Sequence, residues 1–444
     1  MKTVRNFVFV LIAIVSVLWL ISEPQLLSST QFFRWRSALT QYSGMVALVL
    51  MSVAMVLALR LPAIERWTRG LDKAYRLHKW LGISGVSVAV LHWALYQIPT
   101  WLIESEFLEK PVKFTGAGPA GHNLQGWEAW IADLRDVAMN FGEWGFYLLL
   151  VLVGISLWTV VKYRPFKLSH RLMAVAYLML VVHSVLMIKR AYWGEPIYVV
   201  VWAFALLGSA AAVYSLLGFV GRANRHPMRV KSTRFFSQAG VMELVLTPTE
   251  SWQGHKAGQF AYVRFGDEDP HPFTIASASS DPDLKFLIKE LGDFSTGLYQ
   301  RVKPGDNVTL EGPYGRLEFD VSKPQIWVAG GVGVAAFFAI LATLKERSSH
   351  QPAHLFYCCR GLDSQLLDEL WHAAHQARVD LSVIDTQSSP RLNAERIVKR
   401  CGDLTGYELV FCGPESFSQT LKAQLKAYQF DTEHHYHEEL FVMR

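Results

Sequence analysis

The sequence is poor in charge and in cysteine, and both shortages restrict what the protein can be. Charged residues make up 18% of the 444 residues, against 51% for hydrophobic residues, which lies towards the membrane-protein end of the usual range. The four cysteines, all in the C-terminal half, are Cys358, Cys359, Cys401 and Cys412. This placement favours free thiols in a reducing compartment over a disulfide framework. The net charge of +5 is modest and no long basic run is present, so nucleic acid is not an expected partner.

The charge-free part of the chain consists of six apolar runs within residues 1–221. Each lacks Asp, Glu, Lys and Arg and is near the ~20 residues that a membrane-spanning helix needs. The runs are Asn6–Ile21, Tyr42–Leu59, Trp80–Ile103, Trp144–Val161, Leu172–Ile188 and Pro196–Val220. They predict a six-helix transmembrane domain over residues 1–221, and we interpret the first run as a retained helix because no clear signal-peptide cleavage site follows it.

Loop charges predict the orientation of this domain. Basic residues cluster before the first, third and fifth runs and after the sixth, at residues 2–5, 60–79, 162–167 and 222–231. The loop at 104–143, on the opposite side, is richer in acidic residues. The positive-inside rule therefore predicts a multi-pass protein of the inner (cytoplasmic) membrane with both termini in the cytoplasm.

Two of the apolar runs carry a pair of histidines each. His78 and His92 are 14 residues apart, and His170 and His183 are 13 apart, which spans roughly 20 Å of helix. Both runs cross in the same direction, so one histidine of each would meet its counterpart near each membrane face. Neutral imidazole is a standard axial ligand of haem iron, and we predict two stacked haems. Any single histidine is equally well explained as a packing residue or part of a polar relay.

The 13-residue spacing is harder to accommodate than the 14-residue one. In a straight helix it leaves the two side chains ~140° apart, whereas the 14-residue spacing leaves ~40°. The fifth helix is therefore expected to bend, to contain a π-type irregularity, or to present its two histidines on different flanks.

Residues 226–322 read as a small antiparallel β-barrel, because short strands alternate with Gly and Pro turns. The expected strands are Arg229–Phe235, Met242–Leu246, Phe260–Phe265, Phe273–Ala276, Leu284–Lys289 and Asn307–Glu311. After the fifth strand, Lys289, Ser295 and Thr296 stand near the start of a helix expected at Gly297–Val302. They form a candidate phosphate site, although an ordinary N-capped helix explains the same residues.

Residues 323–444 alternate strands with helices, as in a doubly wound nucleotide-binding α/β domain. A buried strand at Gln325–Ala329 leads into a glycine turn and then a helix at Val334–Lys345. The turn holds Gly330, Gly331 and Gly333, which would allow a pyrophosphate to approach the backbone. Arg360 ends the next strand and favours the 2′-phosphate of NADPH, but a solvated arginine at a strand end is an equally good interpretation.

Most of the chain resembles the ferric reductase / NADPH oxidase superfamily of transmembrane flavocytochromes. The two histidine spacings are similar to that family's paired haem b ligands. Further likenesses are 271–277 (His-Pro-Phe-Thr-Ile-Ala-Ser), 288–296, 312–315 (Gly-Pro-Tyr-Gly), 329–333, 411–414 and the near-terminal Phe441. The resemblance implies a ferredoxin-reductase-like module after the helices, with FAD bound by His271, Pro272, Phe273 and Thr274 and by 288–296. It also implies that Cys412 and Gly413 lie beside the nicotinamide, that Phe441 shields the flavin, and that Thr274, Cys412 and Phe441 are catalytic.

Two departures from the family pattern bear on function. Ala335-Ala336 follows the glycine turn where Thr-Pro is usual, and Tyr96 stands where the animal oxidases carry a further histidine. We therefore expect a bacterial NAD(P)H-dependent transmembrane ferric-type reductase with FAD and two haems b, acting on a ferric chelate. A superoxide-producing oxidase acting on O2 is the alternative. A transporter or sensor with a regulatory nucleotide-binding domain is a third, unrelated possibility.

Overall fold

The computed structural model describes residues 2–109, 134–158, 163–317, 322–345 and 351–438. The chain divides into two compact units. Unit 1 comprises Met1–Ile64 and Lys73–Val220, and unit 2 comprises Glu65–Asp72 and Gly221–Arg444. Each unit contains buried apolar clusters of its own, so each is treated by itself below.

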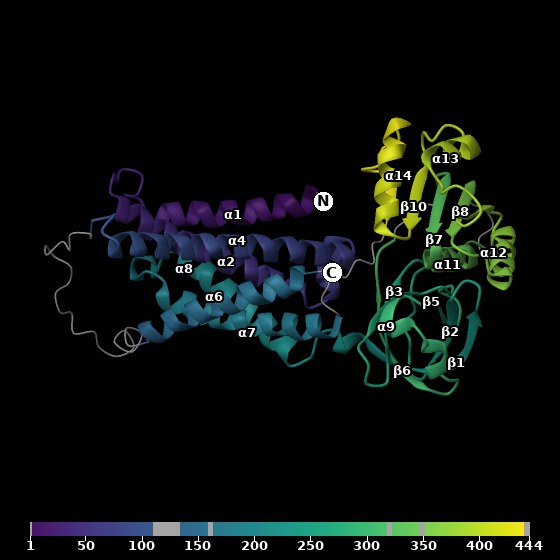
Figure 1. Cartoon of the computed structure of the whole chain (residues 1–444), viewed down its shortest axis with the longest axis horizontal. Helices are drawn as coiled ribbons and strands as arrows, with labels where there is room; N and C mark the ends of the chain where they lie inside the picture. The colour runs from purple at the N-terminus through teal and green to yellow at the C-terminus, as the bar shows by residue number, and fades with distance from the viewer. Residues whose placement is uncertain (1, 110–133, 159–162, 318–321, 346–350, 439–444) are drawn as a thin grey trace. The chain divides into compact units, whose positions relative to one another are not determined.

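Unit 1 is helical. Its elements are α1 (Lys2–Ser22), α2 (Phe32–Leu57), α3 (Pro62–Thr68), α4 (Leu71–Glu104), α6 (Arg135–Leu157), α7 (Tyr163–Met187), the 3-10 turn η1 (Arg190–Tyr192) and α8 (Pro196–Leu216); the end of α3 and the start of α4 fall in unit 2. The long helices run side by side (Figure 1), with α6 along α7 and α2 along α8. Pro196 occupies the first turn of α8, where its missing N–H costs no hydrogen bond.

Five helices, not six, are long and apolar enough to cross a membrane among the described residues. They are α2, α4, α6, α7 and α8, with the α7 span counted from Pro165. The first predicted run lies in α1, whose apolar part, Asn6–Ser22, is shorter than a span. The described residues therefore show five such helices where six were predicted, and the difference is the first predicted run, in α1.

The first sheet of unit 2 confirms the six predicted antiparallel strands. They are β1 (Arg225–Phe236), β2 (Val241–Pro248), β3 (Phe260–Phe265), β4 (His271–Thr274), β5 (Leu284–Lys289) and β6 (Asn307–Tyr314), in the order β4-β3-β6-β1-β2-β5. A single bridge between Ile275 and Phe286 joins the two edges, so the sheet curls into a half-barrel around an apolar core. The short elements η2 (Arg222–Asn224), α9 (Gly292–Ser295) and α10 (Leu298–Arg301) accompany it.

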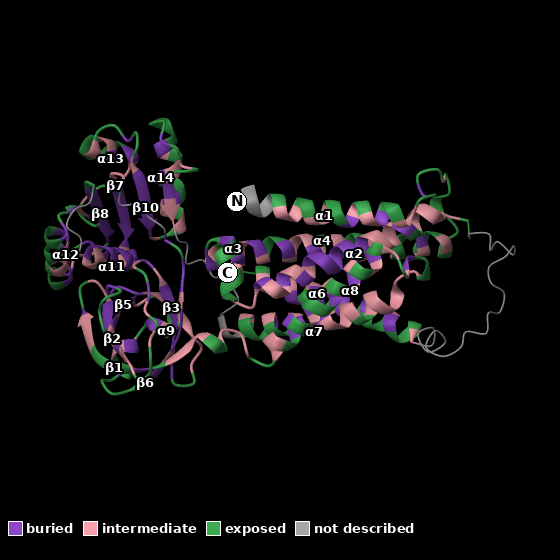
Figure 2. Ribbon diagram, turned by 180° about the vertical axis from the view of Figure 1, so that it is seen from behind, coloured by how far each residue is buried: buried purple, intermediate pink, exposed green. Residues whose placement is uncertain are grey.

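The second sheet is parallel, as predicted. Its strands are β7 (Gln325–Gly330), β8 (Ala353–Cys359), β9 (Asp380–Asp385), β10 (Glu408–Cys412) and β11 (Tyr436–Glu438), in the order β11-β10-β7-β8-β9. The helical elements are η3 (Gly331–Gly333), α11 (Val334–Lys345), α12 (Ser364–Gln376), α13 (Ala394–Cys401) and α14 (Glu415–Ala427). Strands β7, β8 and β10 are buried throughout, as Figure 2 shows, which is typical of a parallel sheet covered on both faces.

Two helices of this α/β part begin at predictable caps. The Asp363 side chain accepts hydrogen bonds from the first turn of α12, and the Asn393 side chain does the same for α13. Such caps satisfy N–H groups that have no partner inside the helix.

Candidate functional site

The structure brings the four histidines together in the predicted pairs. The ring centroids of His78 and His170 lie 5.8 Å apart, and those of His92 and His183 lie 6.2 Å apart. Helix α4 supplies one member of each pair and α7 the other. Helix α7 is α-helical throughout from Tyr163 to Met187, so the π-type irregularity, one of the three expected solutions, is not found. A bend of the helix and the presentation of the two rings on different flanks stay predictions.

Three of the four rings are held by main-chain carbonyl groups of neighbouring helices. The Nδ1 atom of His78 lies 2.8 Å from the Ala54 oxygen, and that of His92 lies 2.8 Å from the Thr40 oxygen, both on α2. The Nδ1 atom of His183 lies 2.9 Å from the oxygen of Ala138 on α6. Because a carbonyl only accepts hydrogen bonds, Nδ1 must carry the proton, which leaves the lone pair on Nε2. Metal-binding histidines are commonly oriented in this way.

Glycines make room for the rings of His92 and His183, called the outer pair here because loop charges predict that they lie near the outer membrane face; His78 and His170 are the inner pair. The sequence reasoning missed these glycines. A β-carbon on Gly142 would lie 2.3 Å from Nδ1 of His183, and one on Gly44 would lie 3.1 Å from Cε1 of His92. Each glycine stands four residues after the carbonyl that the ring binds, so it opens the helix surface beside that oxygen. A glycine four residues after a hydrogen-bonding carbonyl would have been a usable signal only if the neighbouring helices had been known.

The spacing of the pairs fits a metal held between two imidazoles. Two rings that each bind one metal ion at about 2.0 Å place their centroids about 6 Å apart, and the observed values are 5.8 and 6.2 Å. Among the described residues no group of three or more His, Cys, Asp or Glu side chains could hold a bare metal ion. A haem needs only two protein ligands, since the porphyrin supplies the other four nitrogens.

In unit 2, the residues predicted to meet a flavin lie on an edge strand. His271, Pro272, Phe273 and Thr274 form β4, which is half-buried along its length and pairs with β3. The ring of Phe294 stacks on His271 with centroids 3.5 Å apart, and lies 6.4 Å from that of Phe273. These aromatic faces at an open sheet edge fit a planar ring system such as FAD.

The hydroxyl groups expected to bind phosphate have partners inside their own turn. Ser295 is buried and bonds both the N–H and the carbonyl of Leu291. Thr296 donates to the carbonyl of Gly292. The expected helix is the single turn α10, Leu298–Arg301. Neither hydroxyl caps α10, whose N-cap residue is Gly297 and has no side-chain hydrogen bond. The N-capping interpretation is therefore wrong for these two residues, and their role in FAD binding stays a prediction.

The glycine turn meets the Cys412–Gly413 segment at the point where the strand order of the parallel sheet reverses. Strands β7 and β10 are neighbours there, although one continues towards β8 and the other towards β11. A β-carbon on Gly333 would lie 2.1 Å from the Cys412 oxygen, and one on Gly330 would lie 3.3 Å from the α-carbon of Gly413. Open α/β sheets bind ligands at the carboxyl ends of strands at such a switch point.

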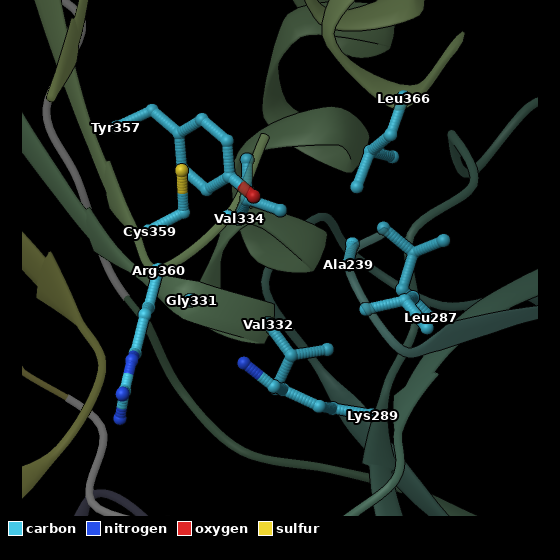
Figure 3. Close-up of a pocket in the computed structure, with 12 residues that line it drawn as sticks. Ala239, Leu287, Lys289, Gly331, Val332, Val334, Tyr357, Cys359, Arg360 and Leu366 are labelled. Atoms are coloured by element: carbon cyan, nitrogen blue, oxygen red, sulfur yellow. The ribbon is translucent and has the colours of Figure 1, made fainter. Parts of the chain in front are cut away.

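A pocket beside this turn is lined by two cationic side chains. It is lined by Ala239, Val241, Leu287, Lys289, Gly331, Val332, Val334, Tyr357, Cys359, Arg360, Gly361 and Leu366. Figure 3 shows Lys289 and Arg360 on either side of the turn that holds Gly331 and Val332. Lys289, which the sequence associated with the FAD phosphates, is thus beside the dinucleotide turn. Burial raises the pKa of the Cys359 thiol, so that side chain adds no negative charge, and an anionic ligand fits the pocket.

One predicted site residue is not described. Phe441 and residues 110–133 of the acidic loop lie outside the described residues. The last described strand, β11, leads towards Phe441. The sequence reasoning missed β11, because its sequence Tyr-His-Glu lacks an apolar pattern.

Two family models match the chain. Residues 43–181 match a ferric reductase-like transmembrane component, and residues 228–318 match an FAD-binding domain. The first match covers both histidine pairs, and the second covers β4 and the Ser295 turn.

Several proteins of known role are similar to parts of the chain. Dual oxidase 2 of Rattus norvegicus is 25% identical over 63% of this chain, and a respiratory burst oxidase homologue (protein J) of Arabidopsis thaliana is 24% identical over 40%. The electron transfer component of toluate 1,2-dioxygenase from Pseudomonas putida is 27% identical over 29%. The chain spans only 19%, 24% and 39% of these relatives, in that order.

Among solved structures, a flavohemoglobin from Malassezia yamatoensis with bound FAD and heme is similar to this chain, at 18% sequence identity and a TM-score of 0.47. The similarity covers 70% of this chain and 97% of the flavohemoglobin chain. A likeness this weak carries no argument about function. The chain is homologous to the NADPH oxidase family and joins a ferric reductase-like transmembrane component to an FAD-binding domain.

Proposed function

We propose that this ferric reductase-like chain is an NAD(P)H-dependent oxidoreductase that moves electrons across a membrane to a ferric-type acceptor. The observation that carries the proposal is the pairing of four histidines at metal-binding distance, three of them with Nδ1 bonded to a carbonyl. The same chain holds a half-barrel with aromatic rings beside β4 and a switch point in its parallel sheet. With cofactors bound, these parts would supply a donor site, a two-electron-to-one-electron converter and two one-electron carriers.

In this proposal each cofactor has its own set of residues. Strand β4 would hold FAD, which would supply hydride acceptance and release of single electrons. His78 with His170, and His92 with His183, would hold two haems b, which would supply one-electron carriers. The chain's own part is to fix imidazole tautomers, to shape the apolar surroundings and to bind the donor.

The acceptor has to react beside the outer pair rather than between its rings. Because His92 and His183 would both be used to hold the haem of this pair, we expect the acceptor to be reduced without becoming a ligand of its iron. Tyr96 lies one turn beyond His92, is 42% exposed, and is covered by the Arg36 guanidinium at 5.7 Å from its ring centroid. A cation at this end suits ferric chelates, which are commonly anionic.

A second candidate function is reduction of O2 to superoxide. It is favoured by the similarity to dual oxidase 2 and to the respiratory burst oxidase homologue. The replacement of the family's extra outer histidine by Tyr96 argues against it. The two activities differ in acceptor and share the rest of the route.

NADPH is the donor that the pocket favours. Arg360 and Lys289 offer two positive charges beside the glycine turn, and the 2′-phosphate of NADPH carries the charge that NADH lacks. Electrons would enter on the cytoplasmic side, where the positive-inside rule places both termini.

The deciding experiment is an absorption spectrum of the purified protein under anaerobic NADPH, followed by addition of a ferric chelate or O2. The proposal expects b-type haem bands that become reduced and are then reoxidised by the chelate. Reoxidation by O2 alone, with superoxide dismutase-sensitive dye reduction, would favour the oxidase. Absence of haem bands would overturn both and favour a transporter or sensor.

A histidine variant tests the proposed order of carriers. Replacing His92 by Leu should remove the outer haem and abolish chelate reduction, while NADPH still reduces the flavin. His372→Leu, on the exposed surface of α12, is the matched control and should keep full activity. Chelate reduction at the wild-type rate in His92→Leu would contradict the route.

A further inference from the structure

The inner histidine pair is held differently from the outer pair. His78, His92 and His183 each bond a main-chain carbonyl through Nδ1, whereas the Nδ1 atom of His170 has a side chain as its partner. That partner is the hydroxyl of Ser156 on α6, 3.4 Å away. The ring of His170 also stacks on Phe166, with centroids 5.2 Å apart and an interplanar angle of 24°.

The difference between a carbonyl and a hydroxyl decides what each ring can do. A carbonyl oxygen only accepts, so it locks the ring in the tautomer that carries the proton on Nδ1. A hydroxyl both donates and accepts, so Ser156 leaves both tautomers of His170 open. A hydrogen bond donated from Nδ1 raises the electron donation of Nε2 to a metal, and a bond of 3.4 Å does so less than one of 2.8 Å.

We propose that Ser156 is a positioning residue of the inner pair. Its hydroxyl accepts a hydrogen bond from the Nδ1–H of His170 and thereby sets the reduction potential of the inner haem alone. The proposal rests on the proposed function, since it requires a haem between His78 and His170. Second-shell hydrogen bonds to axial ligands are an established means of tuning haem potentials. Loss of the bond would weaken donation from His170 and shift the inner haem to a more positive potential.

The chain offers a matched control at the outer pair. The hydroxyl of Ser43 lies 3.3 Å from Nδ1 of His92, nearly the distance found for Ser156 and His170. The same nitrogen of His92, however, has the Thr40 carbonyl at 2.8 Å, and Ser43 itself donates to Leu39 and Thr40. Removal of the Ser43 hydroxyl therefore leaves His92 with its stronger partner.

The test is a redox titration of the purified full chain, followed by visible absorption and by electron paramagnetic resonance of the oxidised haems. Three variants are compared with wild type: Ser156→Ala, Ser156→Thr and Ser43→Ala. Each is also placed in a His92→Leu background, which retains one haem and assigns its signal. We expect Ser156→Ala to shift the inner potential upward and to change the inner resonance. Ser156→Thr should restore both, and Ser43→Ala should change neither haem.

The outcomes separate this proposal from the proposed function. A wild-type protein without b-type haem would overturn the proposed function. Two haems in wild type, with the inner potential unchanged in Ser156→Ala, would overturn the role of Ser156 and leave the function standing. Equal loss of the inner haem in Ser156→Ala and Ser156→Thr would also overturn it, because packing and not the hydroxyl would then be responsible. Loss in Ser156→Ala with retention in Ser156→Thr would support it.

Discussion

Replacing Gly142 by Ala should damage the outer pair selectively. The added β-carbon would lie 2.3 Å from Nδ1 and 2.6 Å from Cε1 of His183, so the ring or helix α6 must move. Overpacking of this kind costs about 1–3 kcal/mol, and loss of the bond to Ala138 adds about 0.5–1.5 kcal/mol. A total of about 1.5–4.5 kcal/mol corresponds to roughly 10- to 2,000-fold weaker haem binding at the outer pair.

Gly154 provides the control on the same helix. No atom lies within 4 Å of a β-carbon built there, and Ala is favoured over Gly in a helix interior by about 0.5–1 kcal/mol. The assay is the haem-to-flavin ratio and the reduced-minus-oxidised spectrum of each purified variant, alongside its thermal unfolding. Gly142→Ala should lose close to half of the haem, whereas Gly154→Ala should retain all of it. A full complement of haem with a wild-type spectrum in Gly142→Ala would refute the reasoning.

Three further predictions concern other parts of the chain. Gly44→Ala should lower outer-haem affinity by no more than about tenfold, because the nearest ring atom of His92 is 3.1 Å from the added β-carbon and needs to move only slightly. A loss of haem content as large as that of Gly142→Ala would contradict this. Arg360→Ala should raise KM for NADPH about 10- to 100-fold and change that for NADH little, since a charged hydrogen bond contributes about 1.5–3 kcal/mol; equal effects on both donors in steady-state kinetics would exclude a 2′-phosphate contact. Glu408→Gln should lower stability by about 1–2 kcal/mol at neutral pH. Burial opposes the charge, but hydrogen bonds from Lys323, His437 and His435 hold the pKa of Glu408 below its ordinary value. The extra stability of the wild type is therefore fully present above about pH 4.3, the ordinary pKa of Glu. It is lost as the pH falls through the lower pKa of the folded state. The contrary result would be a difference in thermal unfolding between wild type and Glu408→Gln that does not narrow as the pH is lowered below about 4.3.

The soluble strands were predictable because their signals are local. Alternation and Gly/Pro turns mark β3 and β5 to the residue, and a buried run followed by glycines marks β7 and α11. The pairing of the histidines was predictable too, since loop charges predict that the two helices run in the same direction. Strand β11 was not, because its pairing with β10 depends on long-range contacts such as the bond between His437 and Glu408.

The surroundings of the histidines could not be predicted from spacing. Periodicity says which face of α4 carries His92, but not that the Thr40 carbonyl and Gly44 of α2 meet that face. In a membrane helix, a glycine is as readily explained by close packing as by a ligand. Only the packing of α6 against α7 identifies Gly142 as the residue that leaves room for the His183 ring. Likewise, the ~140° angle expected between His170 and His183 assumed ideal side-chain directions in a straight helix. The structure pairs both rings with those of α4 and has no π-type irregularity in α7.

The carbonyl contacts also favour an electron route over a proton relay. A histidine that relays protons must accept a proton at one nitrogen and release it from the other. The partners of His78, His92 and His183 at Nδ1 are carbonyl oxygens, which can neither deliver a proton to the ring nor carry one away. Both members of the outer pair are therefore blocked as relay stations, while their Nε2 atoms keep the lone pair that a metal requires. His170 is the one ring whose partner could exchange a proton, and a single such site does not make a path across the membrane.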